Sequence, residues 1–409
     1  MHRSFLSPLV FVVILFSCGE NNRMGANVVK TENTTSPVET SDPPSEYQTA
    51  FPGQTRIAAA KTITPYEGRI VTDKLDHPWG IVQLPDGRFL ITEKRGAMRI
   101  VSGSGQIASP IAGVPAVNAG GQGGLLGITL DPAFTVNRMI YWSFSENTAS
   151  GNLTAVGKAS LSADEQRLEN VQVIYRATPA YRGSLHYGSR VVFDRTGNLL
   201  VSTGERSDIE TRPQAQDLNS ALGKIIRITT NGQPAAGNPF IGNSGARPEI
   251  YTYGHRNVQG LAIHPATGDV WENEFGPRGG DELNLIKAGL NYGWPLISYG
   301  KEYNGKKVGP GISKQKGLEQ PVYFWDPVLS PSGMTFYSGD KMQEWKNNLF
   351  ITGLNSNHIA RLVITNNKVT GEEKMLSDQG QRFRDITQGK DGALYAVTDE
   401  GRLYRIGRK

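Results

Sequence analysis

The sequence of 409 residues is poor in the features that stabilise disulfide-rich or helical folds. It contains one cysteine, Cys18, so the remainder of the chain holds no disulfide and no cysteine-based zinc site. Helical patterning is scarce, and only residues 281–288 and 341–345 suggest a turn or two of helix. The 48 glycines and 23 prolines instead predict a chain with many turns.

Charge of one sign is not concentrated in any segment. The formal net charge is +5, and the basic residues are scattered along the chain. Because no basic run could follow a phosphate backbone, binding to nucleic acid is not expected. A local excess of arginine could still bind a small acidic molecule.

The N-terminus carries a long apolar run, residues 6–16, preceded by His2 and Arg3. The run is too short to span a membrane, and its flanks are typical of an export signal. The sequence LFSCG that ends it resembles a bacterial lipobox with Cys18 as the lipidated residue. We therefore predict a lipoprotein-type signal peptide over residues 1–18 and a periplasmic or outer-membrane-anchored protein, attached to the membrane only through its lipid. A freely secreted protein is the alternative.

Residues 19–65 are rich in Asn, Thr, Ser, Pro and Glu and show little apolar periodicity. A segment of this composition buries too little apolar surface to form a core, so a disordered tether is predicted. The folded part of the chain is expected to begin at Tyr66.

From Tyr66 onward a short β-rich unit recurs, and it begins with a glycine turn. Copies read DGRFLIT at residues 86–92, TGNLLVS at 196–202 and DGALYAV at 391–397. Six such units predict an all-β fold, a six-bladed β-propeller of four-stranded antiparallel blades over residues 66–409. A pair of β-sandwiches is the alternative, but the regular return of the unit favours one closed ring. Loops on one face of a propeller surround its central shaft, so functional residues are expected in loops.

Residues 251–294 hold the densest group of polar residues, glycines and aromatics. The loop GHRN ends an apolar run and brings the guanidinium of Arg256 beside an amide side chain. A Gly-Pro turn at 276–277 offers carbonyl oxygens, and the carboxylates of Asp281 and Glu282 follow. Carbonyls combined with carboxylates are the ligands that Ca²⁺ prefers, so a metal corner is predicted beside anion-binding donors. A loop that only turns the chain, with Arg256 in a structural ion pair, is the alternative.

His186 is the best candidate for proton transfer, within the sequence GSLHYG before an apolar run. Small neighbours let a substrate approach, and imidazole is the side chain best suited to take a proton near neutral pH. A purely structural histidine is the alternative. Glu205 follows the next β-rich run, where it could orient the imidazole or instead pair with Arg206 at the surface.

Two further patterns indicate a flat, anionic ligand. The glycine-rich residues 120–127 lack the Lys-Ser/Thr of a phosphate loop, but they suit a close approach of the backbone to a flat ligand, with Gln122 as the polar group. Arg382 and Arg384 alternate on a predicted strand and so share a face. Two guanidiniums on one face repel each other unless an anion lies between them, which predicts an anionic ligand. A solvated strand face is the alternative.

The motifs GHRNVQG, EFGPRGGDELN and NYGWP occur in this order between residues 254 and 295. Together they resemble the PQQ-dependent soluble sugar dehydrogenases, also called the glucose/sorbosone dehydrogenase family, and the aldose sugar dehydrogenases most of all. The resemblance implies a six-bladed propeller that binds pyrroloquinoline quinone (PQQ) and Ca²⁺. It also implies oxidation of aldose sugars at C1 to lactones, with hydride passing to the quinone and electrons leaving to a separate, unidentified acceptor.

The resemblance also implies roles for particular residues. His186 would be the general base, Glu205 its orienting carboxylate, and Arg256 the group that polarises the quinone. The implied cofactor contacts are Gln122, Arg256, Asn257, Gln259, Asn355, Arg382 and Arg384. The implied metal ligands are the Gly276 and Pro277 carbonyls beside the cofactor, and Glu282 and the Tyr292 carbonyl at a second calcium, with Glu302 as a further candidate there. Asp281 is a further predicted metal ligand.

Two positions depart from the glucose-oxidising members of this family. Leu185 replaces an acidic residue, which puts a preference for glucose in doubt, and Asn355 replaces a lysine that contacts PQQ. Two other functions stay open: a calcium-dependent propeller lactonase without a quinone, and a non-catalytic glycan-binding propeller. The Arg382 and Arg384 pair argues against the lactonase, because a neutral lactone needs no such clamp.

Overall fold

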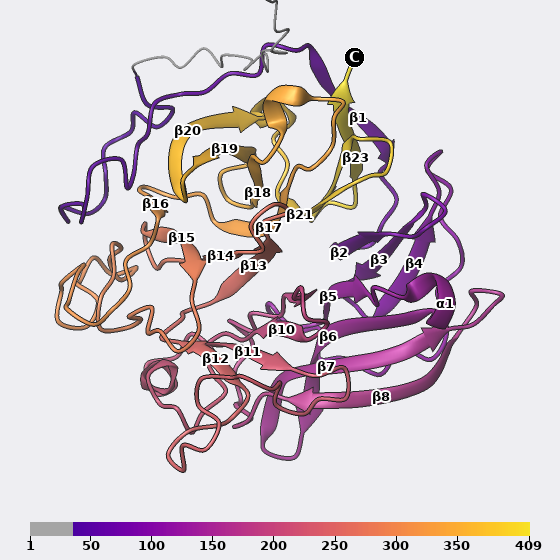
Figure 1. Cartoon of the computed structure of the whole chain (residues 1–409), viewed down its shortest axis with the longest axis horizontal. Coiled ribbons are helices and arrows are strands. Elements are labelled where there is room, and N and C mark those ends of the chain that lie inside the picture. The colour runs from indigo at the N-terminus through magenta and orange to yellow at the C-terminus, as the bar shows by residue number, and fades with distance from the viewer. Residues whose placement is uncertain (1–35) are drawn as a thin grey trace, which may run out of the picture. The chain divides into compact units, whose positions relative to one another are not determined.

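In the computed structural model, residues 36–409 are described, and they fold mainly into antiparallel β-strands (Figure 1). The predicted signal peptide, including Cys18, and residues 19–35 lie outside the described residues. The strands form six sheets, and within five of them the strands follow one another in chain order. Such sheets arranged in a ring are the blades of a β-propeller, which confirms the predicted all-β fold.

We number the blades I to VI after their innermost strands, each of which contacts the next around the ring. These strands are β2 (Pro78–Gln83), β5 (Leu125–Leu130), β9 (Val191–Phe193), β13 (Val258–Ile263), β17 (Pro331–Phe336) and β21 (Phe383–Gln388). The outer strands of blade I are β3 (Phe89–Glu93) and β4 (Ala97–Val101), those of blade II are β6 (Met139–Thr148), β7 (Gly151–Leu161) and β8 (Leu168–Arg176), and those of blade III are β10 (Leu199–Ser202), β11 (Lys224–Ile228) and β12 (Ile250–Tyr253). The outer strands of blade IV are β14 (Val270–Glu274), β15 (Asp281–Ile286) and β16 (Tyr323–Trp325), and those of blade V are β18 (Leu349–Gly353), β19 (Ile359–Thr365) and β20 (Lys368–Met375). The outer strands of blade VI are β22 (Leu394–Thr398), β23 (Leu403–Arg408) and β1 (Tyr66–Thr72).

Blade I has three regular strands, and an irregular segment takes the place of the fourth. Ala108 N–H donates to the Ile100 carbonyl at 2.9 Å, and Ile111 N–H donates to the Met98 carbonyl at 3.0 Å. Residues 107–111 therefore run along β4 without forming a regular strand. The other five blades have four strands each, as predicted.

The two ends of the propeller close the ring together. Strand β1 pairs antiparallel with β23, from Tyr66 opposite Arg408 to Thr72 opposite Leu403, so the first strand completes the last blade. Figure 1 shows β1 and β23 side by side near the C-terminus. Because the pairing joins the start of the ring to its end, it leaves no open blade boundary.

Helix is a minor component of the described residues. It is limited to α1 (Phe134–Asn137) and the 3₁₀ turns η1 (Arg212–Ala215), η2 (Gln343–Trp345) and η3 (Ser377–Gln379). Of residues 281–288, suggested as helix by their sequence, residues 281–286 instead form β15, because this segment pairs with β14 and buries Leu283 in the core. No helix among residues 36–409 is long and apolar enough to cross a membrane.

A buried ion pair lies where the innermost strands meet. Arg190 directly precedes β9, and its Nη1 donates to Asp385 Oδ2 on β21 at 2.7 Å. Arg190 Nε also donates to the carbonyl of Gln259 on β13 at 3.0 Å, and the N–H of Ile81 on β2 donates to Asp385 at 3.0 Å. One guanidinium–carboxylate pair thus connects blades I, III, IV and VI.

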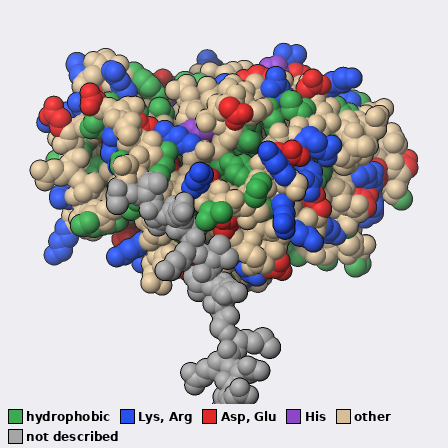
Figure 2. All heavy atoms as spheres, turned by 90° about the horizontal axis from the view of Figure 1, so that it is seen from above, with side chains coloured by type: hydrophobic (Ala, Val, Ile, Leu, Met, Phe, Trp, Pro, Cys, Tyr) green, Lys and Arg blue, Asp and Glu red, His purple; other side chains and the backbone are tan. Residues whose placement is uncertain are grey.

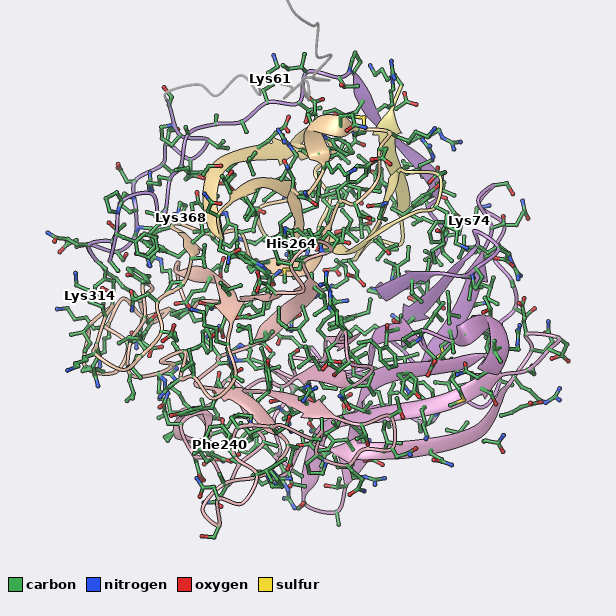
Figure 3. The ribbon with its side chains drawn as sticks, viewed as in Figure 1. Lys61, Lys74, Phe240, His264, Lys314 and Lys368 are labelled. Carbon is green, nitrogen blue, oxygen red and sulfur yellow. The ribbon has the colours of Figure 1, made fainter. Side chains whose placement is uncertain are left out.

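The segment before β1, residues 36–65, packs against the propeller. Ala60 N–H donates to the Glu372 carbonyl on β20 at 2.7 Å, and Glu372 N–H donates to the Ala58 carbonyl at 3.2 Å. Lys61, labelled in Figure 3, lies at the outer edge of the ring beside this contact. The prediction of a disordered tether is therefore wrong for residues 36–65. The composition of residues 36–65 was misleading because hydrogen bonds to partners far along the chain hold this segment. Such long-range partners cannot be identified from the periodicity of the sequence.

Replacing Gln54 tests how firmly this segment is held. Gln54 is fully buried; its Nε2 donates to the Pro321 carbonyl at 2.8 Å, and its Oε1 accepts from Ala50 N–H at 2.7 Å and from the Tyr299 hydroxyl at 3.1 Å. Because Gln54→Ala leaves these buried partners unsatisfied, we expect it to lower the free energy of unfolding by about 1–3 kcal/mol. Denaturant unfolding measures the loss, and Gln48→Ala, at an exposed position, is the matched control. Equal stability of the two variants would contradict the packing described.

Candidate functional site

One large cavity gathers the predicted functional residues from separate blades. Its volume is about 1000 Å³, and it opens among the loops around the ring centre. The predicted residues that line it are Gln122, His186, Arg256, Gln259, Gly276, Pro277, Asp281, Asn355, Arg382 and Arg384. Residues separated by more than a hundred positions in the sequence thus face one space, as expected for the loops of a propeller.

A buried carboxylate holds the imidazole of His186. His186 precedes blade III and has a left-handed φ of 46°, which turns its loop sharply. Its Nδ1 lies 2.6 Å from Glu205 Oε1, and both side chains are almost fully buried. Because Glu205 binds Nδ1, Nε2 is the nitrogen available to a molecule in the cavity. The contact predicted between the His186 imidazole and the Glu205 carboxylate is present in the structure.

The surroundings keep His186 uncharged. Burial lowers its pKa to about 4, the Arg256 guanidinium acts in the same direction, and Glu205 opposes both. Near neutral pH the imidazole therefore carries no charge and can accept a proton.

Three amide side chains fix the loop that carries His186. Gln122 Oε1 accepts the N–H of His186 at 2.8 Å. Asn257 Oδ1 accepts the N–H of Gly188 at 2.9 Å, and Gln259 Nε2 donates to the Gly188 carbonyl at 2.9 Å. Asn257 is fully buried and does not line the cavity, so the structure gives it a positioning role.

Arg256 is held against the Gly-Pro turn. Its Nη1 donates to the Gly276 carbonyl at 2.7 Å, its guanidinium lies over the Trp294 ring at 5.1 Å, and its backbone N–H donates to Glu274 Oε2 at 2.5 Å. These contacts place a positive charge in the cavity wall beside His186.

Asp281 shapes the same turn through its side chain. Its Oδ1 accepts the Gly276 N–H at 2.8 Å, and its Oδ2 accepts the N–H groups of Leu329 and Ser330 at 2.8 and 2.7 Å. Burial raises its pKa to about 6, and these hydrogen bonds limit the rise. Both oxygens are thus engaged by backbone donors, so Asp281 is better suited to hold the turn than to bind a metal.

An internal anion separates the two predicted cofactor arginines. Asp399 Oδ2 accepts from Arg382 Nε at 3.0 Å and Oδ1 accepts from Arg384 Nε at 2.8 Å. Although burial acts in the opposite direction, Arg384 and Arg382 hold the pKa of Asp399 below its usual value. The expectation that the pair requires an anion between them is met by a side chain, which the sequence analysis missed.

Lys94 is a second residue that the sequence analysis missed. It follows β3, lines the cavity, and donates from Nζ to the Ala119 carbonyl at 3.1 Å. Burial and Arg384 lower its pKa. Positive and negative side chains are interspersed over the face shown in Figure 2, whereas the cavity gathers five cationic side chains against three acidic ones. A cavity of this charge suits an anionic ligand.

A group of buried acidic residues lies behind the Gly-Pro turn. His255 Nδ1 is 3.1 Å from Glu274 and 3.6 Å from Glu272, and the ligand atoms of these three residues lie within 4.8 Å of one another. Asn284 Nδ2 donates to Glu272 at 2.7 Å and to Glu282 at 3.2 Å. Burial, together with the charge of Glu274, raises the pKa of Glu272 and of Glu282.

Of the residues predicted for the second calcium, Glu282 and Tyr292 border a small cavity next to this acidic group. Glu302 does not join them, because it pairs with Arg212 at 2.5 Å. Glu272 and Glu274 were missed, although their spacing on one buried strand places both carboxylates on the same face.

The titration of His186 tests the described electrostatics. Because its folded pKa of about 4 lies below the usual 6.5, the unfolded chain binds a proton between these values and the folded chain does not. Stability should therefore fall as the pH is lowered through this window, and the imidazole should stay neutral at pH 5. NMR of histidine-labelled protein measures the titration midpoint of the His186 imidazole, and the His186→Asn variant assigns its signal. Glu205→Gln should lower this pKa further, because it removes the negative charge beside Nδ1. A midpoint near 6.5 would contradict the buried site.

Comparison with known proteins places the chain in a family. The model of the family Glucose / Sorbosone dehydrogenase matches residues 75–405. Aldose sugar dehydrogenase YliI of Escherichia coli is 42% identical over 342 residues, which is 82% of this chain and 91% of that protein.

Solved structures agree with this match. The apo-form of the soluble aldose sugar dehydrogenase from Escherichia coli has a TM-score of 0.81 at 40% identity, covering 84% of this chain and 100% of that one. The PQQ-bound form of aldose sugar dehydrogenase from Streptomyces coelicolor has a TM-score of 0.70 at 29% identity, covering 85% and 99%. The chain belongs to the glucose/sorbosone dehydrogenase family.

Proposed function

We propose that this protein oxidises aldose sugars at C1 to lactones, with PQQ and Ca²⁺ as cofactors and His186 as the general base. The observation that carries the proposal is the convergence of His186, Arg256, Arg382 and Arg384 on one cavity. A PQQ-bound relative supports the choice of cofactor. The cationic wall makes a lactonase or a plain glycan-binding site less fitting, since neutral sugars and lactones need no such charge.

The residues of the cavity fit PQQ, which carries several carboxylates. Arg382, Arg384 and Lys94 would bind carboxylate groups, and Asp399 keeps the two guanidiniums in position without neutralising the whole wall. Lys94 could supply the positive charge that Asn355 lacks. The amides of Gln122 and Gln259 would bind polar edges of a flat ring.

The residues around the Gly-Pro turn also fit Ca²⁺. The Gly276 and Pro277 carbonyls would hold the ion beside the cofactor. The Gly276 carbonyl also accepts a hydrogen bond from Arg256 Nη1. For a second ion, Glu272 Oε2 is buried without a hydrogen-bond partner, and a cation at Glu282 would offset the repulsion among these carboxylates.

His186 performs the proton transfer in this proposal. Its Nε2 accepts the proton of the C1 hydroxyl, and Glu205 at Nδ1 stabilises the imidazolium that forms. When bound, PQQ supplies the acceptor for the hydride that leaves the same carbon, so loss of a proton and a hydride converts the aldose to its lactone. Arg256 supplies a fixed positive charge where negative charge develops. Gln122, Asn257 and Gln259 hold the His186 loop in place throughout.

The cellular localisation of the protein is also a proposal. We infer an exported lipoprotein, anchored through Cys18 to a bacterial membrane on its periplasmic side, from the composition of residues 1–18. Electrons would then pass to an acceptor in the same compartment.

Sugar-dependent reduction of an artificial dye tests the function. Protein reconstituted with PQQ and Ca²⁺ should reduce the dye with at least one sugar in an aldose panel. Because His186 is the proposed base, His186→Ala should lower kcat by about 10²–10⁴-fold while sugar binding is kept. His264→Asn is the control, because His264, labelled in Figure 3, directly follows β13 and is not among the residues that line the cavity. Absence of turnover with every aldose would remove the assignment.

Thermal unfolding tests the second calcium. Adding Ca²⁺ to chelator-treated protein should raise Tm by about 3–10 °C, since an ion that binds only the folded state stabilises it. Glu282→Gln should lose most of this rise. Glu302→Gln is the matched control, because Glu302 pairs with Arg212 instead. Equal calcium shifts in the two variants would contradict an ion at Glu282.

A further inference from the structure

The N-terminal segment reaches the catalytic cavity. Asp42, Pro43 and Pro44 line it together with the residues described above, and we call residues 42–44 the N-terminal tip. The match to the family model begins at residue 75, so the tip is not among the residues that define the family. A part of the cavity wall therefore comes from outside the shared propeller.

The tip is anchored on both sides. After it, the buried Ser45 donates from Oγ to Asp326 Oδ2 at 2.8 Å. Before it, the Ser41 carbonyl accepts from Arg56 Nη2 at 2.6 Å, and the same nitrogen donates to the Asp326 carbonyl at 2.8 Å. Because both anchors meet at Asp326, next to strand β16, the tip is held in one position over blade IV.

The tip continues into a wall made by two other segments. A Cβ placed on Gly279 would lie 3.1 Å from Pro44 Cγ, so the tip rests directly on the turn after Pro277. The next contact is between Arg278 and Lys301, whose backbones exchange hydrogen bonds of 2.8 and 3.1 Å. Tyr303 follows, lines the same cavity, and is 74% exposed.

The chemistry of this wall suits a sugar ring. Asp42 offers an exposed carboxylate that accepts hydrogen bonds from hydroxyl groups. Pro43 and Pro44 offer a rigid apolar surface without N–H donors, and Tyr303 offers an exposed aromatic ring with a polar tip. Sugars present hydroxyls at the ring edge and C–H groups on the ring faces, which match these two kinds of surface.

The cavity has room for more than one sugar ring. Its volume of about 1000 Å³ stands at the upper end of the range for sites that bind small molecules, roughly 300–1000 Å³. The cationic side chains Lys94, Arg382 and Arg384 come from blades I and VI, whereas the tip and Tyr303 belong to the side of blade IV. The tip and Tyr303 are therefore separate from the side chains proposed to bind the cofactor carboxylates, and they adjoin the Gly-Pro turn proposed to hold Ca²⁺.

We infer that the N-terminal tip and Tyr303 form a sugar subsite, which binds the second ring of an aldose disaccharide while the reducing end lies at His186. This inference rests on the proposed function for the identity of its substrate. Asp42 binds hydroxyls of the second ring, and Tyr303 contacts its face. The segment before the propeller is thereby a specificity-determining part of the enzyme.

Comparison of a monosaccharide with disaccharides tests the subsite. In the reconstituted full-length protein, Asp42→Ala and Tyr303→Ala should each raise KM for cellobiose or maltose by about tenfold, the effect of losing one strong contact. KM for glucose and kcat for all three sugars should stay within twofold, because the reacting carbon is bound elsewhere. Equal rises for glucose and the disaccharides, or no rise for either, would overturn the inference.

Two controls separate a subsite from a structural effect. Tyr303→Phe keeps the ring and should retain most of the disaccharide affinity. Asp340→Ala removes an exposed carboxylate outside the cavity lining and should leave both KM values unchanged. A loss of disaccharide affinity in Asp340→Ala as large as in Asp42→Ala would count against the subsite.

Calorimetry distinguishes failure of the subsite from failure of the proposed function. Cellobiose is titrated into the protein without PQQ, so no turnover is needed. If dye reduction fails with every aldose but Asp42→Ala and Tyr303→Ala weaken cellobiose binding about tenfold, the proposed function is wrong and the subsite stands. If the protein does not bind cellobiose, or both variants bind it as the parent does, the subsite is wrong.

Discussion

The buried Arg190–Asp385 ion pair is the contact on which the arrangement of the site depends. The side chains that line the cavity come from different blades, so their distances are set by how the innermost strands sit against one another. Arg190 bonds to partners on β13 and β21 at once, and its guanidinium lies 4.6 Å over the ring of Trp79, which lines the cavity. A planar guanidinium constrains both distance and angle, so its main effect here is positional. Loss of one partner from such a buried pair costs about 3–5 kcal/mol.

Other groups of the protein hold the charged side chains of the site in position. Three of the cations in the wall have fixed partners: Asp399 lies between Arg382 and Arg384, and the Gly276 carbonyl holds Arg256. These partners offset the repulsion between the positively charged side chains, so the loops that carry them can lie close together. The positive charge of Arg256, together with burial, also keeps the His186 imidazole neutral near neutral pH.

The catalytic unit extends beyond the propeller. Residues 36–65 reach the cavity wall at residues 42–44 and then follow the outer strands of blades IV and V, held by buried polar groups such as Ser45 and Gln54. A propeller leaves the outer edge of each blade exposed, and this segment covers part of one such edge by pairing with β20. An addition at the N-terminus can therefore alter the substrate cavity while the ring itself stays unchanged.

The amino-acid sequence by itself determined the six-bladed ring and ten of the residues that line the cavity. Recurring glycine turns and short β-rich runs are local signals, and the ordered motifs around Arg256 are readable without coordinates. Tertiary structure alone decided that Asn257 supports Gly188, that Asp399 separates two arginines, and that residues 36–65 are ordered. The physical reason is the same in each case. These outcomes depend on hydrogen bonds between groups far apart in the chain, and no local pattern of composition or periodicity encodes which donor will meet which acceptor.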